Sequence, residues 1–159
     1  MGSDAPRLDV FISYSHDDDP KWLDRIRVHL ARLIREGEVH LWDDRQIKAG
    51  KHWREEIRTA LAQARVAVLL ISADFYASDF IANDELPPLL EAERQRGLVI
   101  LGVHINYSSF DSDRTLSEYQ TINPPDEPLE SLGTKAEQEK VFDKLRRRIE
   151  ELLGPPSPR

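Results

Sequence analysis

The sequence lacks cysteine altogether, and it has no apolar run long enough to cross a membrane. Without cysteine there can be no disulfide, no thiolate metal ligand and no thiol nucleophile. The N-terminal residues carry no hydrophobic region of the kind found in secretory signals. We therefore expect a cytoplasmic protein that has no membrane partner.

Positive charge is also scarce, because 22 Lys and Arg residues stand against 29 Asp and Glu residues, a formal net charge of −7. This balance argues against direct binding of nucleic acid or of an anionic membrane. The seven glycines form no glycine-rich phosphate loop of the P-loop or dinucleotide-fold kind. A bound nucleotide would have to lie in a cleft between other loops.

Short apolar runs alternate with amphipathic segments along the whole chain. The central run, Val66–Ser72, is rich in β-branched residues and predicts a strand buried on both faces, which is typical of a parallel sheet. Further strands are predicted at residues 8–14, 39–42, 98–105 and, as a short edge strand, 119–122. Helices are predicted at residues 22–34, 53–64, 87–96 and 134–153. Residues 73–84 are predicted to be a polar crossing, and residues 106–118 a loop with at most a short helix.

Alternating strands and helices favour the α/β class with parallel pairing. The simplest arrangement is a flavodoxin-like three-layer sandwich with a central parallel sheet of about five strands in the order 2-1-3-4-5. One domain is expected over residues 8–153. Residues 1–7 would be a disordered N-terminus or a scar of cloning, and residues 154–159 a linker or tail, which would fit a domain cut from a longer chain.

In this strand order, ligands bind where strands 1 and 3 diverge, at the carboxyl edge of the sheet. The order brings three segments to that edge: the turn at Ser15–Asp19, the loop at Asp43–Lys51 and the segment around Glu85. Pro87 favours a helix that begins close to Glu85, so the helix's positive end would stabilise an ionised carboxylate there.

His16–Asp19, where one histidine precedes three aspartates, is a candidate metal site. Oxygen-ligated cations need several converging carboxylates, often with a loop glycine, which this turn lacks. No second cluster has the spacing of zinc ligands. We expect no metal.

Four stretches, taken in order, resemble the TIR (Toll/interleukin-1 receptor) domain family, and more closely its bacterial NAD-cleaving members. Asp9–His16 resembles the opening box. Trp42–Trp53 resembles the second box with its BB loop, Ser72–Leu86 the stretch that carries the catalytic glutamate, and Tyr119–Asn123 the end of bacterial TIR domains. The resemblance covers Leu8 to about Leu153.

This resemblance implies cleavage of the bond between nicotinamide and ribose in NAD, with Glu85 as the catalytic carboxylate. Ile81 stands where NAD-cleaving relatives often carry a tryptophan, four residues before the glutamate. Phe80, Trp42 or Trp53 would then supply the stacking on nicotinamide. The candidate NAD contacts are Ser13, Ser15, His16, Asp43, Lys48, Phe80 and Ile81.

The chemistry fits a site of this composition. Ordinary glycosidases use two carboxylates, one of them to protonate the leaving oxygen. The nicotinamide of NAD is already cationic and departs as a neutral molecule, so one carboxylate that stabilises the oxocarbenium-like state is sufficient. NAD is then the substrate, and no cofactor is required.

Each candidate also has an ordinary structural interpretation. Glu85 could be a solvated carboxylate at a helix start, and Ser13, Ser15 and His16 could serve a turn and the entry to a helix. Asp43 could pair with neighbouring cations at the surface. Lys48 could be a solvated loop lysine.

Two functions therefore remain open. The first is an NAD glycohydrolase, possibly also a cyclase, that is activated by self-association in bacterial immunity or virulence and is fused to or partnered with a sensor or effector domain. The second is a non-catalytic module that signals by TIR–TIR assembly. A phospho-receiver domain was set aside, since it needs an aspartate at the end of strand 3, where Ile71 and Ser72 stand.

Overall fold

In the computed structural model of the chain, residues 7–43 and 52–154 are described. Except for Arg7 and Gly154, the expected terminal segments lie outside these residues, as does Lys48 with the loop at 44–51. The described part contains a five-stranded sheet in the order β2-β1-β3-β4-β5. All four strand pairings are parallel. The predicted fold class and strand order are thus confirmed.

The strands are close to their predicted bounds. They are β1 (Leu8–Ser13), β2 (Val39–Asp43), β3 (Val66–Ile71), β4 (Val99–His104) and β5 (Gln120–Thr121). Every residue of β3 is buried, as expected for the centre of a sheet that is covered on both faces.

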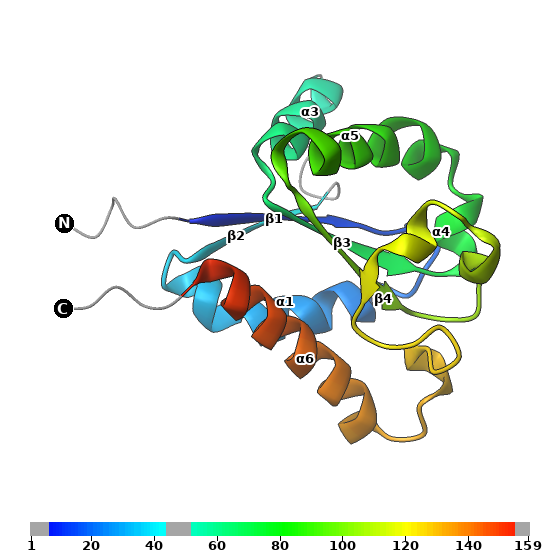
Figure 1. Cartoon of the computed structure of the whole chain (residues 1–159). Coiled ribbons are helices and arrows are strands. Elements are labelled where there is room, and N and C mark those ends of the chain that lie inside the picture. The colour runs from blue at the N-terminus through cyan, green and yellow to red at the C-terminus, as the bar shows by residue number, and fades with distance from the viewer. Residues whose placement is uncertain (1–6, 44–51, 155–159) are drawn as a thin grey trace.

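Two pairs of helices cover the sheet (Figure 1). Helices α1 (Lys21–Arg35) and α6 (Lys135–Leu153) lie on one face, and α3 (Trp53–Gln63) and α5 (Leu86–Arg96) lie on the other. Side chains alternate between these two layers along each strand. In β1, Val10 and Ile12 pack with the α1/α6 layer, whereas Phe11 packs with the α3/α5 layer. Ser13, two residues beyond Phe11, therefore faces α3 and α5.

The crossing after β3 is more ordered than predicted. Residues Ala73–Ala77 form a short helix, α4, and Ile81–Glu85 form a π-helical turn that leads into α5. The hydroxyl of Ser72 caps α4 by accepting a hydrogen bond from the backbone N–H of Phe75, at 2.9 Å. Phe75 and Ile81 are buried and anchor the crossing in the α3/α5 layer, so tertiary packing overrides its polar composition.

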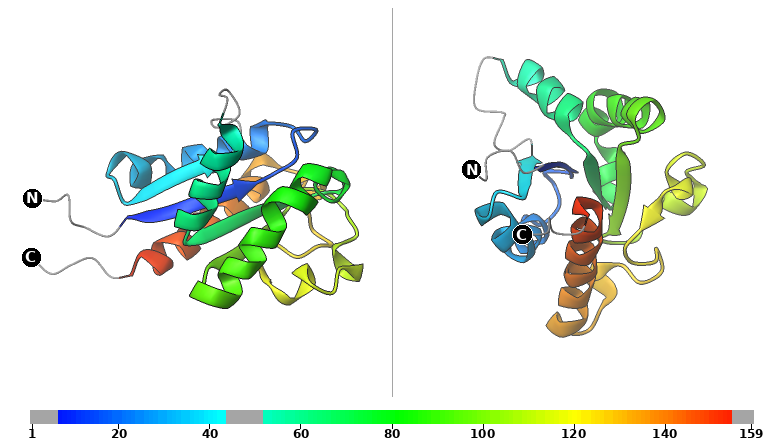
Figure 2. Two further views of the ribbon diagram at one scale, coloured as in Figure 1. Left: turned by 90° about the horizontal axis from the view of Figure 1, so that it is seen from above. Right: turned by 60° about the vertical axis from the view of Figure 1, so that its left-hand side comes forward.

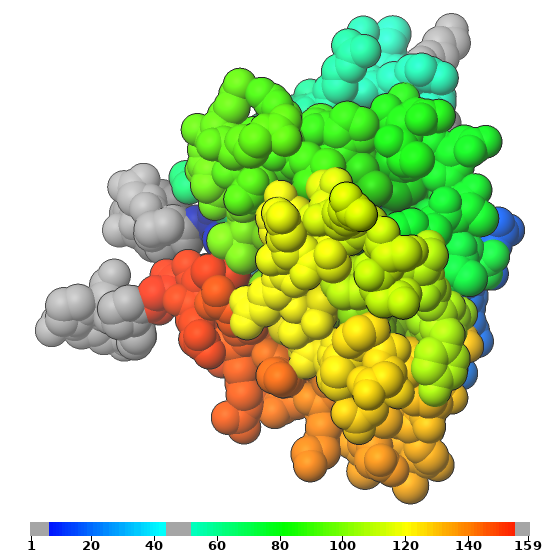
Figure 3. Space-filling view, turned by 45° about the vertical axis from the view of Figure 1, so that its right-hand side comes forward, coloured from blue at the N-terminus to red at the C-terminus, as the bar shows by residue number. Residues whose placement is uncertain are grey.

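The segment at 106–118 contains only short helical turns, in line with its predicted loop character. 3₁₀ turns lie at Phe110–Ser112 and Leu116–Glu118, and Figure 3 shows this part of the chain (yellow) lying between α5 and the start of α6.

In α6, Phe142 is fully buried, whereas Val141 is only partly buried. Phe142, Leu145 and Ile149 form the helical stripe that faces the sheet.

Strand β1 begins, and helix α6 ends, on the same side of the molecule (Figure 2). This is the amino edge of the sheet. The carboxyl edge, where α4 lies, is on the opposite side (Figure 1).

Candidate functional site

A serine and a glutamate from different elements meet at the carboxyl edge of the sheet. The Ser13 hydroxyl donates a hydrogen bond to Oε1 of Glu85 over 2.6 Å. Ser13 is 0% exposed and Glu85 is 1% exposed. The carboxylate therefore lies in the protein and against the first strand, and not in bulk water.

Glu85 lies in a π-helical turn just before two prolines. The N–H of Leu86 donates to the carbonyl of Ile81, five residues back, which closes this turn. Pro87 and Pro88 have no backbone N–H and follow in the first turn of α5, where prolines are tolerated. Turns of this type occur frequently at functional sites. Glu85 ends this turn at the first residue before α5, close to the positive end of that helix.

A small cavity lies between the turn after β1 and the segment before Glu85. It has a volume of about 160 Å³ and is lined by Tyr14, Ser15, His16, Asp17, Ser78, Phe80 and Ile81. The structure thus brings together four of the predicted contacts, Ser15, His16, Phe80 and Ile81. Ser13 and Glu85 do not line the cavity themselves, but Ser13 directly precedes Tyr14, and Glu85 ends the same π-helical turn that Ile81 begins.

The lining residues also have structural contacts. The Ser15 hydroxyl accepts a hydrogen bond from the N–H of Asp17 at 3.2 Å, which stabilises the turn. The exposed His16 ring stacks on Tyr14 with 5.1 Å between ring centroids. Phe80 is half-buried and lies edge-on to Trp53 at 5.5 Å, whereas Ile81 is 2% exposed and packs in the core.

Asp43 lies apart from these residues. It is 0% exposed, and its carboxylate pairs with the guanidinium of Arg27 from α1. Its partner in the sheet register is Ile12, which faces the α1/α6 layer, so Asp43 lies on the opposite face from Ser13. The expected partners of Asp43 were surface cations close to it in the chain, whereas its observed partner, Arg27, comes from α1 and the pair has a buried carboxylate. The role of Asp43 in NAD binding stays a prediction, as does that of Lys48.

Two features of this edge were not expected from the sequence: the burial of a histidine, and a hydrogen bond between a serine and an aspartate. His104 ends β4 and is 1% exposed, and neither ring nitrogen has a hydrogen-bond partner within the described residues. Burial lowers the pKa of His104 to about 4. The Ser72 hydroxyl donates to the carboxylate of Asp18 at 2.6 Å. Burial raises the pKa of Asp18, although the Ser72 hydrogen bond opposes the shift.

One signal could have pointed to His104: it is a polar residue near the end of a predicted buried run. Its backbone is clamped by Asn123, whose side chain accepts from the N–H of His104 at 2.9 Å and donates to its carbonyl at 3.0 Å. Its ring lies edge-on to Phe110 at 4.6 Å.

Within residues 7–43 and 52–154, no three His, Asp or Glu residues are grouped so that they could hold a metal ion. Over the same residues, no helix is both long and apolar enough to cross a membrane. The arrangement is therefore that of one buried carboxylate beside a small polar cavity.

Comparison with known proteins identifies the family of this fold. Over 94 residues, or 59% of the chain, it is 32% identical to y4lF, an uncharacterized protein of Sinorhizobium fredii (strain NBRC 101917 / NGR234). The alignment spans only 29% of that protein's length.

Among solved structures, the chain resembles the TIR domains of the activated Roq1 resistosome that directly recognizes the pathogen effector XopQ. The TM-score is 0.53 at 19% identity, with 88% of this chain and 84% of that chain covered. It also resembles a prokaryotic SEFIR domain, with a TM-score of 0.54 at 17% identity, covering 96% and 99% of the two chains. At these identities the likeness shows the fold alone. The family model described as TIR domain matches residues 10–145, and the chain therefore belongs to the TIR domain family.

Proposed function

We propose that this TIR domain is an NAD glycohydrolase in which Glu85 is the catalytic carboxylate. The observation that carries the proposal is the pairing of Glu85 with Ser13 beside the cavity at the carboxyl edge. Open α/β sheets bind ligands at this edge, next to the switch in strand order. Strands β1 and β3, which precede the two segments, are neighbours in the sheet.

In the proposed reaction, the bond between C1′ of the ribose and the nicotinamide nitrogen breaks, and the bonding electrons leave with neutral nicotinamide. The ionised carboxylate of Glu85 stabilises the positive charge that develops on the ribose. The oxygen of a water molecule bonds to C1′ and its proton passes to solvent, which gives ADP-ribose. In a cyclising variant, an atom of the adenine would take the place of water.

The Ser13 hydroxyl would orient the carboxylate. A hydroxyl–carboxylate hydrogen bond at 2.6 Å holds one oxygen firmly. In the proposal, the other oxygen is the one that faces the ribose. Phe80, at the rim of the cavity and beside Trp53, is the candidate for stacking on nicotinamide.

The proposal includes activation by self-association. A cavity of about 160 Å³ is smaller than most sites for small molecules, and Glu85 is nearly inaccessible. The segment from Ser78 to Ile81 must therefore move before NAD can reach the carboxylate. Contacts with a second copy could stabilise that open form, since any partner that binds one state preferentially shifts the equilibrium toward it.

The burial of Glu85 also favours a second candidate function, a non-catalytic module that signals through TIR–TIR assembly. A buried carboxylate that bonds to Ser13 ties the start of α5 to β1, and this tie would serve the fold without any chemistry. The two functions differ in whether NAD is consumed.

The experiment that separates them follows nicotinamide release from NAD by concentrated protein, comparing Glu85→Gln with Asp84→Asn. Glutamine retains an oxygen that can accept from Ser13 but lacks the charge, so Glu85→Gln should lower turnover by at least about 100-fold, typical for loss of one electrostatic group. Asp84 is the exposed neighbour, and Asp84→Asn should retain most of the activity. Equal activity of Glu85→Gln and the wild type would refute the catalytic role.

A further inference from the structure

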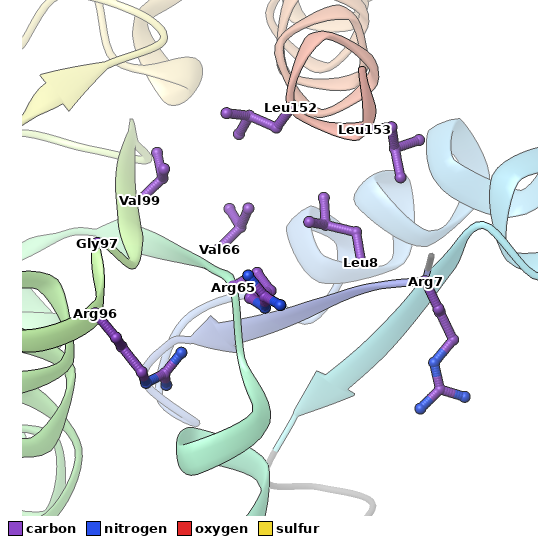
Figure 4. A pocket seen from close by; sticks show the side chains of 9 residues that line it. All are labelled: Arg7, Leu8, Arg65, Val66, Arg96, Gly97, Val99, Leu152 and Leu153. Carbon is purple, nitrogen blue, oxygen red and sulfur yellow. The ribbon is translucent and has the colours of Figure 1, made fainter. Parts of the chain in front are cut away.

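Two adjoining hollows at the amino edge of the sheet share the same three arginines, Arg7, Arg65 and Arg96. The first hollow has a volume of about 280 Å³ and is otherwise lined mainly by aliphatic side chains from β1, β3, β4 and the end of α6: Leu8, Val66, Val99, Leu152 and Leu153. The second is polar and also includes Asp9 and Gln63. Figure 4 shows Arg65 and Arg96 on one side of the aliphatic group.

The Arg96 guanidinium is held in place by backbone carbonyls, and no carboxylate among residues 7–43 and 52–154 forms an ion pair with it. It donates to the carbonyl of Ala64 at 2.5 Å and to that of Leu61 at 2.7 Å, at the carboxyl end of α3. Carbonyl acceptors fix the orientation of the guanidinium and leave its positive charge available. Arg96 is therefore a preorganised cation at the border of the two hollows.

Arg65 has a fixed backbone and an exposed side chain. Its N–H donates to the carbonyl of Asp9 at 2.8 Å, and its carbonyl accepts from the N–H of Val99 at 3.0 Å. No acidic side chain in the described part of the chain forms an ion pair with its guanidinium. Position 65 therefore presents a second unneutralised cation from the start of β3.

Asp9 is the acidic residue of this lining, and it already has cationic neighbours. Its carboxylate pairs with Arg7 at 3.2 Å and lies 3.6 Å from Nδ1 of His40. Arg7 thus neutralises the negative charge of Asp9, and the positive charges of Arg65 and Arg96 remain available to a ligand.

We propose that this double hollow binds a short aliphatic carboxylate. The planar guanidinium groups of Arg65 and Arg96 match the two oxygens of a carboxylate, and the five aliphatic side chains offer an apolar floor for the hydrocarbon chain. None of the described residues that line the double hollow is aromatic, which favours an aliphatic over an aromatic ligand. The site lies at the opposite edge from Glu85 and does not depend on NAD cleavage.

The test uses the whole chain and octanoate as the probe, with calorimetric titration and amide chemical shifts as readouts. Octanoate should bind saturably and shift the amides of residues 65–66, 97–99 and 152–153. Octanamide has the same chain without the charge, and acetate the charge without the chain. Both should bind at least about tenfold more weakly, which corresponds to the loss of about 1.4 kcal/mol.

Matched variants locate the site. Arg65→Gln should weaken octanoate binding about tenfold and leave the melting temperature unchanged, because its side chain is exposed. Leu152→Asn should weaken octanoate binding because it removes one of the aliphatic side chains that contact the hydrocarbon chain. Arg54→Gln, at the start of α3, should not change the binding. Absence of saturable binding, equal affinity for octanamide, or an unchanged affinity in both Arg65→Gln and Leu152→Asn would overturn the proposal.

Discussion

At the scale of single residues, burial determines what the polar groups at the carboxyl edge of the sheet can do. Ser13 and Glu85 are both buried, so water does not compete for the hydrogen bond between them. The bond is therefore strong, and removal of either partner lowers the stability of the fold. Ser15 is also buried, but its hydroxyl accepts a single longer bond within its own turn. The two serines therefore offer a matched comparison.

Ser13→Ala should lower the free energy of unfolding by about 2 kcal/mol, because it removes the hydroxyl donor from a buried carboxylate. Urea denaturation measures the effect. Ser15→Ala, the control, should lower it by less than about 1 kcal/mol, since a turn hydrogen bond contributes less. If both variants are equally stable, the Ser13–Glu85 bond does not hold the site together.

His104 makes the stability of the fold depend on pH. Its folded-state pKa of about 4 lies below the ordinary value of 6.5, so the unfolded chain binds the proton more tightly. Below pH 6.5, protonation therefore favours unfolding, and between pH 7 and pH 4 this one group should remove about 3 kcal/mol of stability.

His104→Leu should flatten this part of the pH dependence, measured as the free energy of unfolding between pH 4 and pH 7. His52→Leu is the control, because that side chain is 75% exposed, and the pH dependence should be the same as in the wild type. A His104→Leu variant that loses stability as steeply as the wild type on acidification would contradict the assignment.

At the scale of elements, an ion pair with a fully buried carboxylate, Arg27–Asp43, joins α1 to β2. Arg27→Gln should lower the free energy of unfolding by about 2 kcal/mol or more, because Asp43 is 0% exposed and loses its guanidinium partner. Arg25→Gln is the matched control on the same helix. Both partners of the Arg25–Glu139 pair are partly exposed, so loss of this pair should lower the free energy of unfolding less. Thermal unfolding compares the two. Equal losses would show that the Arg27–Asp43 pair has no special role.

The strands and the long helices could be predicted from the sequence because each carries its own signal. Val66–Ile71 is continuously apolar, and α1 repeats apolar residues at helical spacing. Helix α4 could not be predicted in this way, because five residues give no periodicity and its stability depends on the Ser72 cap and on the burial of Phe75.

The site could be predicted in part, for related reasons. The strand order places the end of β1 next to the segment after β3, so the proximity of Ser13 and Glu85 follows from topology. The face of Asp43 could have been inferred from its alternation with Val39 and Leu41, both of which are buried in the α1/α6 layer. Its pairing with Arg27 could not, since this depends on how α1 is rotated against the sheet.

At the scale of the whole molecule, the two edges of the sheet differ in charge. The turn after β1 and the crossing after β3 carry several aspartates: Asp17, Asp18, Asp19, Asp74, Asp79 and Asp84. The amino edge carries the arginines of the double hollow. The pyrophosphate of NAD is anionic, so the proposed reaction needs cations near the carboxyl edge. The candidate sources are a neighbouring copy and Lys48, which lies outside the described residues. A cation from a neighbouring copy would fit the proposed activation by self-association.

The measurement that tests the central claim most directly is NAD turnover by the wild-type domain fused to a clustering tag, with the products resolved by mass. The proposal predicts that clustering raises nicotinamide release well above that of the dilute monomer. Each nicotinamide should be accompanied by one ADP-ribose or cyclic ADP-ribose, and clustered Glu85→Gln should release nicotinamide at least about 100-fold more slowly. If the clustered wild type, verified as folded and assembled, leaves NAD intact, Glu85 is a structural residue and the domain acts through assembly alone.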